Sequence, residues 1–167
     1  MTTGYSPYVP EFDFITPRLA VGSRVSPQGL PNLKERGVTH LLAIDTHPPL
    51  ALAAQYEITI FSQHFRDDLQ PKPSSLLLPI AQFALTTLNT PGTILLVTCG
   101  AGMYRAPMVA LLILRLLGYG LEEAQELISA QRWGVRFPDA YVESVEATVQ
   151  AWWQATEGGA AAGSYKQ

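Results

Sequence analysis

Short apolar runs alternate with longer segments along most of the chain. Four runs of four to seven residues are rich in Leu, Ile and Val and contain no Asp, Glu, Lys or Arg, which favours buried strands. These runs cover residues 19–23, 38–44, 58–61 and 93–97. Helix start and stop signals border the other segments, such as Ser74 or Ser75 as a cap and Gly37 as a stop. The expected helices cover residues 30–36, 49–55, 74–89, 106–117, 121–131 and 139–155.

This order of elements defines the expected fold class. Strands that alternate with helices indicate an α/β fold, with a mainly parallel central sheet of four to five strands flanked by helices. The helix at 106–117 is apolar nearly all round apart from Arg115, so we expect it to lie buried against the sheet. Residues 1–10 predict an irregular lead, 11–156 one folded domain and the Gly/Ala-rich residues 157–167 a disordered tail.

Composition and charge narrow the class of partners. The 167 residues are 47% hydrophobic, which is normal for a globular protein, and 15% charged, which is below the usual quarter. The length indicates one domain, and this composition excludes disorder over the whole length. A net charge of -3 provides no basic surface for nucleic acid and no polybasic patch for a membrane. The first residues lack a signal-peptide pattern, and the longest apolar stretch, 107–117, is too short to span a bilayer. We therefore expect a cytoplasmic protein without nucleic-acid or membrane partners; the sequence does not fix its oligomeric state.

The single cysteine, Cys99, stands at a junction between elements. One cysteine excludes an intrachain disulfide and makes a cysteine-based zinc site improbable on counting alone. Cys99 ends the last predicted strand, Arg105 follows six positions later, and Pro107 falls in the first turn of the next helix, where proline is accepted. The loop between them contains Gly100 and Gly102. The pattern is a strand, a tight glycine-containing loop and a helix.

Such a loop predicts an anion site with a nucleophile at its base. Backbone N–H groups of residues 100–105 can turn inward as a nest for an anion, and the N-terminus of the following helix favours the same charge. Arg105 can add a two-pronged contact to phosphate oxygens. These surroundings stabilise the thiolate of Cys99, which could then attack phosphorus. The alternative is that Cys99 is an ordinary buried apolar residue at a strand end.

The segment Cys99-Gly-Ala-Gly-Met-Tyr-Arg105 resembles the Cys-(x)5-Arg signature loop of the cysteine-dependent protein phosphatases. It is most similar to the dual-specificity branch and, within that branch, to the phosphatases of regenerating liver. The resemblance implies a phosphotyrosine-phosphatase-like fold, catalysis by Cys99 and Arg105, and neither metal nor cofactor. It extends to residues 15–23, which look like the opening strand, and to 33–42 and 122–132. The phosphate-binding residues that it implies are Gly100, Ala101, Gly102, Met103, Tyr104 and Arg105.

The resemblance also implies a general acid on an upstream loop. Asp67 and Asp68 stand 32 and 31 positions before Cys99. Asp67 is preferred because the family often has an apolar residue two positions before its acid, as Phe65 is here. A positioned carboxylic acid can protonate the leaving oxygen and then, as a base, activate water. The alternative is that both aspartates are turn residues beside Pro71.

Two positions depart from the family pattern. Thr98 replaces the usual histidine before the cysteine, and Ala106 replaces the usual serine or threonine after the arginine. That hydroxyl is implied to help the thiolate leave in the second step, so its absence predicts slow breakdown of a covalent intermediate. The expected function is a slow phosphoprotein phosphatase acting on phosphotyrosine, phosphoserine or phosphothreonine. Alternatives are a phosphoprotein-binding pseudophosphatase and a rhodanese-like sulfur carrier, against which the position of Arg105 counts.

A few other residues bear on substrate choice. The loop has no basic residue besides Arg105, which favours a singly phosphorylated protein over a highly charged inositol phosphate. Arg132 and Arg136 flank Trp133 and are expected either to line a substrate groove or to lie on the solvated surface. His40 lies in a predicted strand without a partner motif, so a structural role is expected for it.

Overall fold

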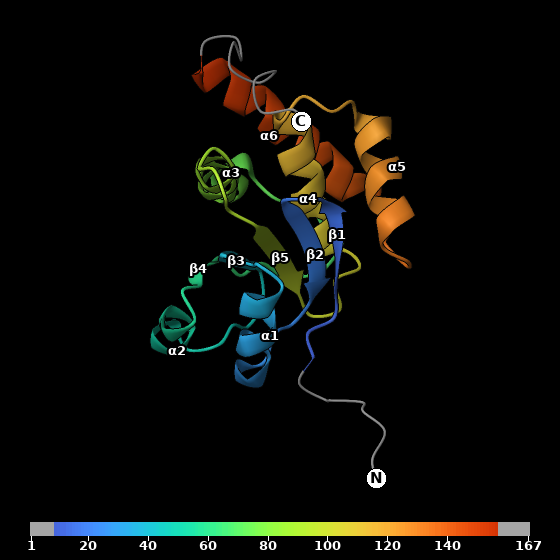
Figure 1. The fold of residues 1–167 in the computed structure, drawn as a ribbon. Helices are drawn as coiled ribbons and strands as arrows, with labels where there is room; N and C mark the ends of the chain where they lie inside the picture. The colour runs from blue at the N-terminus through green and yellow to red at the C-terminus, as the bar shows by residue number, and fades with distance from the viewer. Residues whose placement is uncertain (1–8, 157–167) are drawn as a thin grey trace.

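The computed structural model describes residues 9–156. The disordered tail expected at 157–167 and most of the irregular lead expected at 1–10 lie outside the described residues. Five strands and six α-helices, with one 3-10 turn, make up the described part, shown in Figure 1. In chain order they are β1 (Phe12–Thr16), β2 (Leu19–Ser23), η1 (Pro27–Gly29), α1 (Leu30–Glu35), β3 (His40–Ala43), α2 (Leu50–Gln55), β4 (Thr59–Ser62), α3 (Ser74–Leu88), β5 (Leu95–Cys99), α4 (Arg105–Leu116), α5 (Leu121–Gln131) and α6 (Asp139–Ala155).

The strands form one sheet in the order β1-β2-β5-β3-β4. All neighbouring pairs are parallel except β1 and β2, so the expected mainly parallel α/β sheet is confirmed. The strand expected at 19–23 is confirmed as β2. Residues 15–23, which resemble an opening strand of the phosphatase family, are not one continuous strand. That stretch turns at Pro17 and Arg18, and β1 and β2 pair as an antiparallel hairpin. Proline has no N–H for a sheet ladder and a fixed φ, which favours a turn at this point.

Helices cover both faces of the sheet, and side chains alternate between them. Figure 1 shows α1 and α2 on one side and α3 to α6 on the other. Along β3, Leu41 belongs to the hydrophobic cluster under α1 and α2, whereas Leu42 belongs to the larger cluster under α3 to α6. Along β5, Leu96 faces the first cluster, and Val97 and Cys99 face the second. This alternation, with a period of two, places the cysteine against α4.

Helix α4 is the central element of the larger cluster. Every residue of α4 except Arg105 and Arg115 is buried, which confirms the expected buried helix. Arg115 reaches Glu146 of α6 through two hydrogen bonds of 2.9 and 3.0 Å. Such two-pronged pairing fixes a guanidinium at the edge of an otherwise apolar helix. Within residues 9–156, no helix combines the length and the hydropathy needed to cross a bilayer.

One expected helix start differs in detail. Ser74 is the first residue of α3 instead of its cap, and the cap position belongs to Pro73, which offers no side-chain hydrogen bond. The Ser74 hydroxyl instead accepts a hydrogen bond of 3.2 Å from Thr148 Oγ1 of α6. The serine is therefore used in helix-to-helix packing. Proline suits the entry position because it lacks the N–H that would need a partner.

Candidate active site

The loop between β5 and α4 surrounds the sulfur of Cys99 with backbone donors. Cys99 is buried, and its Sγ accepts hydrogen bonds from the N–H of Gly102 at 3.2 Å and of Ala106 at 3.3 Å. Gly102 has a φ of 69°, and a Cβ there would lie 2.6 Å from backbone atoms of Gly22. Only glycine fits this position without displacing a strand. Two backbone N–H groups therefore point at the same sulfur atom.

Arg105 is the first residue of α4, and its guanidinium lies over this loop. Its Nη1 donates to the carbonyl oxygen of Phe65 at 3.0 Å, and its Nη2 lies 3.8 Å from Asp45 Oδ2. Its Nε is buried and has no hydrogen-bond partner among the described residues. A buried donor without a partner is costly, so it marks a place where a ligand oxygen would be favourable. Because Nη2 would lie 3.5 Å from a Cβ on Gly100, the guanidinium leans directly over the loop.

The loop of residues 99–105 and the guanidinium of Arg105 together form what we call the cradle. A second arginine and a carboxylate lie next to this cradle, and sequence reasoning missed both. Arg24 follows β2; its backbone N–H donates to the Gly100 carbonyl at 3.2 Å, and its Nη2 donates to Asp45 Oδ2 at 2.6 Å. That hydrogen bond lowers the pKa of the Asp45 carboxyl below its usual value, so Asp45 is ionised at neutral pH. One carboxylate shared by Arg24 and Arg105 leaves the cradle with positive charge. Both missed residues follow the carboxyl ends of strands that flank β5, where sites of parallel sheets form.

The two candidate acids have different surroundings. Asp68 Oδ1 accepts a hydrogen bond from Lys72 Nζ at 2.6 Å, which lowers the pKa of Asp68. Asp67 Oδ1 instead accepts a hydrogen bond from the Tyr141 hydroxyl at 2.9 Å. Burial, with the bond to Asp67, raises the pKa of Tyr141 to about 12, so the phenol remains a proton-bearing donor at neutral pH.

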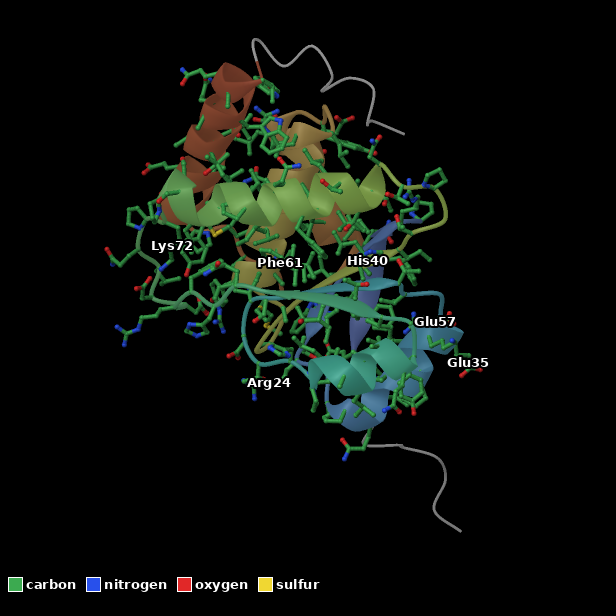
Figure 2. All side chains as sticks on the ribbon, turned by 90° about the vertical axis from the view of Figure 1, so that its left-hand side faces the viewer. Arg24, Glu35, His40, Glu57, Phe61 and Lys72 are labelled. Atoms are coloured by element: carbon green, nitrogen blue, oxygen red, sulfur yellow. The ribbon has the colours of Figure 1, made fainter. Side chains whose placement is uncertain are left out.

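The loop that holds both acids is tied to the Cys99 loop. The preceding residue Phe65 is buried in the larger hydrophobic cluster, and its carbonyl accepts the Arg105 bond described above. Figure 2 shows Lys72, from the acid loop, and Arg24, from the rim of the cradle, on the same side of the molecule. Glu35 and Glu57 lie on the opposite side in that view. The structure therefore brings the upstream aspartates and the Cys99 loop to one end of the sheet.

Arg132 corrects an expectation from the sequence. It neither lines a groove nor lies on the solvated surface, because its side chain is only 3% exposed. Its Nε donates to the Gly102 carbonyl at 2.8 Å, and its Nη2 donates to the Ala101 carbonyl at 3.1 Å. Carbonyls that point outward to Arg132 leave the N–H groups of the same loop free to point inward. A guanidinium suits this task because its donors have a fixed planar arrangement.

The rest of the Arg132 surroundings explains how a buried charge is tolerated. Its Nη2 and Nη1 also pair with Glu11 at 2.6 Å and Asp13 at 2.9 Å. The segment that follows Arg132 adds a further hydrogen bond to the loop, from the N–H of Arg136 to the Met103 carbonyl at 2.9 Å. Trp133, between the two arginines, is 88% exposed. The outer side of the Cys99 loop is thus fixed by residues about thirty positions downstream, whose role no local pattern indicates.

Solved structures of similar shape were found, although no protein-family model matches the chain and no curated protein matches its sequence. PTPMT1 is similar with a TM-score of 0.77 and 16% identity, over 87% of this chain and 99% of its own. Human DUSP28 is similar with a TM-score of 0.72 and 19% identity, over 86% and 99%. Human tyrosine phosphatase-like serine/threonine/tyrosine-interacting protein is similar with a TM-score of 0.73 and 17% identity, over 86% and 98%.

These similarities define the class of fold. The chain has the fold of the cysteine-dependent phosphatases of the dual-specificity type. The phosphotyrosine-phosphatase-like fold that the Cys99 loop implied is thereby confirmed. Among residues 9–156, no three His, Cys, Asp or Glu side chains gather closely enough to hold a metal ion.

Proposed function

We propose that the protein is a phosphoprotein phosphatase that works through a cysteinyl-phosphate intermediate. The observation that carries this proposal is the cradle itself: two N–H groups aimed at the sulfur of Cys99, beneath a buried Arg105 Nε without a partner. A phosphate bound there would place phosphorus over the sulfur and its oxygens against the Arg105 Nε and the loop amides. Donors held in place where charge develops are the main source of such catalysis.

The proposed reaction has two steps. In the first, the Cys99 thiolate forms a bond to phosphorus, the bond from phosphorus to the leaving oxygen breaks, and a carboxylic acid gives that oxygen a proton. In the second, the same carboxylate takes a proton from water, the water oxygen bonds to phosphorus, and the sulfur–phosphorus bond breaks. The products are inorganic phosphate and the regenerated thiolate.

Asp67 is the proposed acid. Asp68 is held in an ion pair with Lys72 that keeps it deprotonated, which is the wrong state for the first step. Asp67 has a phenol donor, Tyr141, which can orient one carboxyl oxygen and leave the other for the substrate.

Asparagine at each position separates the two candidates. Asp67→Asn is expected to lower kcat/KM for phenyl phosphate about a hundredfold, because this constant reports the steps up to loss of the leaving group, and phenolate is a poor leaving group that needs the proton. The same change should lower kcat/KM for p-nitrophenyl phosphate less, because nitrophenolate leaves readily without help. Asp68→Asn is the matched control and should change both values of kcat/KM only a few-fold. Measurements of kcat/KM with the two substrates test this, and the larger leaving-group-dependent loss in Asp68→Asn would reverse the assignment.

The substrate proposed is a protein carrying a single phosphate. Arg105 is the one basic side chain of the loop, and the charge of Arg24 beside it is balanced by Asp45. A site with so little uncompensated charge suits a phosphomonoester on a peptide better than a polyphosphorylated headgroup. PTPMT1 is known in complex with PI(5)P, which makes that lipid the comparison substrate.

A second function has one specific observation in its favour. Ala106 gives its N–H to the sulfur, but its side chain has no hydroxyl to assist the thiolate as leaving group. A protein that binds phosphate and turns over very slowly would act as a phosphoprotein-binding module. Human tyrosine phosphatase-like serine/threonine/tyrosine-interacting protein, one of the similar structures, is named for interaction.

Pre-steady-state kinetics with p-nitrophenyl phosphate distinguish the two functions. The phosphatase is expected to release a burst of nitrophenolate close to the enzyme concentration and then to turn over slowly, with one phosphoryl group on Cys99 after an acid quench. Ala106→Ser should raise the steady rate about tenfold, because a hydroxyl then reaches the sulfur. Ala106→Gly, which adds no hydroxyl, should not. Tight binding of a phosphopeptide with neither burst nor turnover would replace the phosphatase with the binding module.

A further inference from the structure

A cavity lies at the end of the sheet opposite to Cys99. It measures about 640 Å³, within the range of small-molecule sites. Arg18, which lines it, accepts at its carbonyl a hydrogen bond from Leu95, the first residue of β5, whereas Cys99 is the last. Leu88 at the end of α3 and Leu117 after α4 close the cavity from the helical side. A ligand in this cavity would be separated from the Cys99 loop by the length of β5.

The wall of the cavity is the outer surface of the larger hydrophobic cluster. Ile15, Leu88 and Leu117 belong to that cluster, and Leu127 of α5 packs against it. These four aliphatic side chains offer no hydrogen bonds, so the body of a ligand held against them must be apolar. Removing apolar surface from water is the main source of binding in such sites.

One charged side chain lines the cavity, and it is held in place without being neutralised. Arg18 Nε donates to the Thr93 carbonyl at 2.9 Å, and Nη2 donates to the Thr90 carbonyl at 2.7 Å and to Thr93 Oγ1 at 2.6 Å. All three acceptors are uncharged, and Nη1 takes part in none of these bonds. Among the described residues, no carboxylate forms an ion pair with Arg18. The cation therefore lies fixed beside an apolar wall, with its charge uncompensated.

We propose that this cavity binds an amphiphile with one anionic head, of the class of medium-chain alkyl carboxylates. The head would lie on the guanidinium of Arg18, and the alkyl chain would lie along Ile15, Leu88 and Leu127. A guanidinium already fixed by three bonds loses little freedom when it pairs with a carboxylate. The single cation limits the head to one negative charge. This proposal is independent of the chemistry proposed for Cys99.

Titration of the full chain with decanoate, followed by backbone amide NMR, tests the proposal. Decanoate is expected to shift the amides of residues around Leu88, Leu117 and Leu127. Decanol, which lacks the charge, and acetate, which lacks the chain, should each bind at least about tenfold more weakly. Equal affinity for decanoate and decanol, or shifts confined to the Cys99 loop, would overturn the proposal.

Three variants make the test specific. Arg18→Leu should weaken decanoate about tenfold and leave decanol unchanged. Leu127→Gln, which makes the wall polar and leaves Arg18 in place, should weaken both ligands, and it keeps the test decisive if Arg18→Leu does not fold. Arg36→Leu is the matched control, because that guanidinium stacks on Phe12 in the cluster under α1 and α2. A loss in Arg36→Leu as large as in Arg18→Leu would show nonspecific attraction and refute the site.

Discussion

Replacing Cys99 with serine is expected to reduce p-nitrophenyl phosphate turnover by more than about a thousandfold. The cradle would keep its amide donors and Arg105, but a serine hydroxyl ionises far less readily than a thiol and is a weak nucleophile without an adjacent base. Each factor of ten in rate corresponds to about 1.4 kcal/mol of transition-state stabilisation. Because the variant keeps the groups that bind phosphate and loses only the nucleophile, the loss of turnover should arise in the chemical step and not in phosphate binding.

Two measurements keep this prediction specific. Phosphate should raise the thermal unfolding midpoint of Cys99→Ser as much as that of the wild type, because ligand binding to the folded state stabilises it. Iodoacetamide can label only Cys99, since the chain has one cysteine, and phosphate should slow that labelling. Unchanged turnover in Cys99→Ser would exclude the covalent mechanism. Loss of turnover together with loss of phosphate binding would instead indicate that the loop had collapsed.

Local sequence signals predicted most of the secondary structure. The bounds of α5 and α6 agree with expectation because both helices follow clear breaks, at Gly120 and at Pro138. The hairpin of β1 and β2 was missed because its pairing is antiparallel and lies at the edge of the sheet. An apolar run marks a buried strand, but it does not show which neighbour that strand has.

The residues of the candidate site also fall into those that local sequence indicates and those that only the fold brings together. Cys99 and Arg105 could be found because they belong to one short loop whose chemistry can be read from consecutive residues. Arg132 and Tyr141 could not, because they act on residues 30 and 74 positions away in the chain. Arg24 shows the limit most clearly, since its contact with Asp45 depends on two strands lying on either side of β5. Only the assembled sheet brings such residues together.

The net charge of the chain and the local charge at the site act differently on a phosphorylated substrate. The chain carries a net charge of -3, so long-range attraction for a phosphorylated substrate is weak. At the candidate active site, positive charge comes from Arg24 and Arg105, whose two guanidiniums share the carboxylate of Asp45. Arg132 adds none, because Glu11 and Asp13 balance it. Its contribution is therefore to the geometry of the loop, which leads to a distinct expectation.

Removing Arg132 should cost both stability and activity. Arg132→Met is expected to lower the free energy of unfolding by about 3 kcal/mol, because the Ala101 and Gly102 carbonyls lose their donors at roughly 1–2 kcal/mol each. Glu11 and Asp13 contribute less, since their side chains are 69% and 46% exposed and can return to water. Chemical denaturation at fixed pH measures this loss. Glu11→Gln and Asp13→Asn are the controls, and each should cost less than about 1 kcal/mol.

Arg132→Lys separates a positioning role from plain stability. Lysine keeps the charge but not the planar pair of donors that holds the Ala101 and Gly102 carbonyls. The N–H groups of the loop should then no longer be oriented toward a bound phosphate. With the variant fully folded, kcat/KM for p-nitrophenyl phosphate is expected to fall about a hundredfold, as for a misplacement of about 1 Å. Phosphate should then protect Cys99 from iodoacetamide less well than in the wild type. A lower unfolding midpoint with unchanged kcat/KM and unchanged protection would show that Arg132 supports the fold alone, and that the Cys99 loop holds its shape without it.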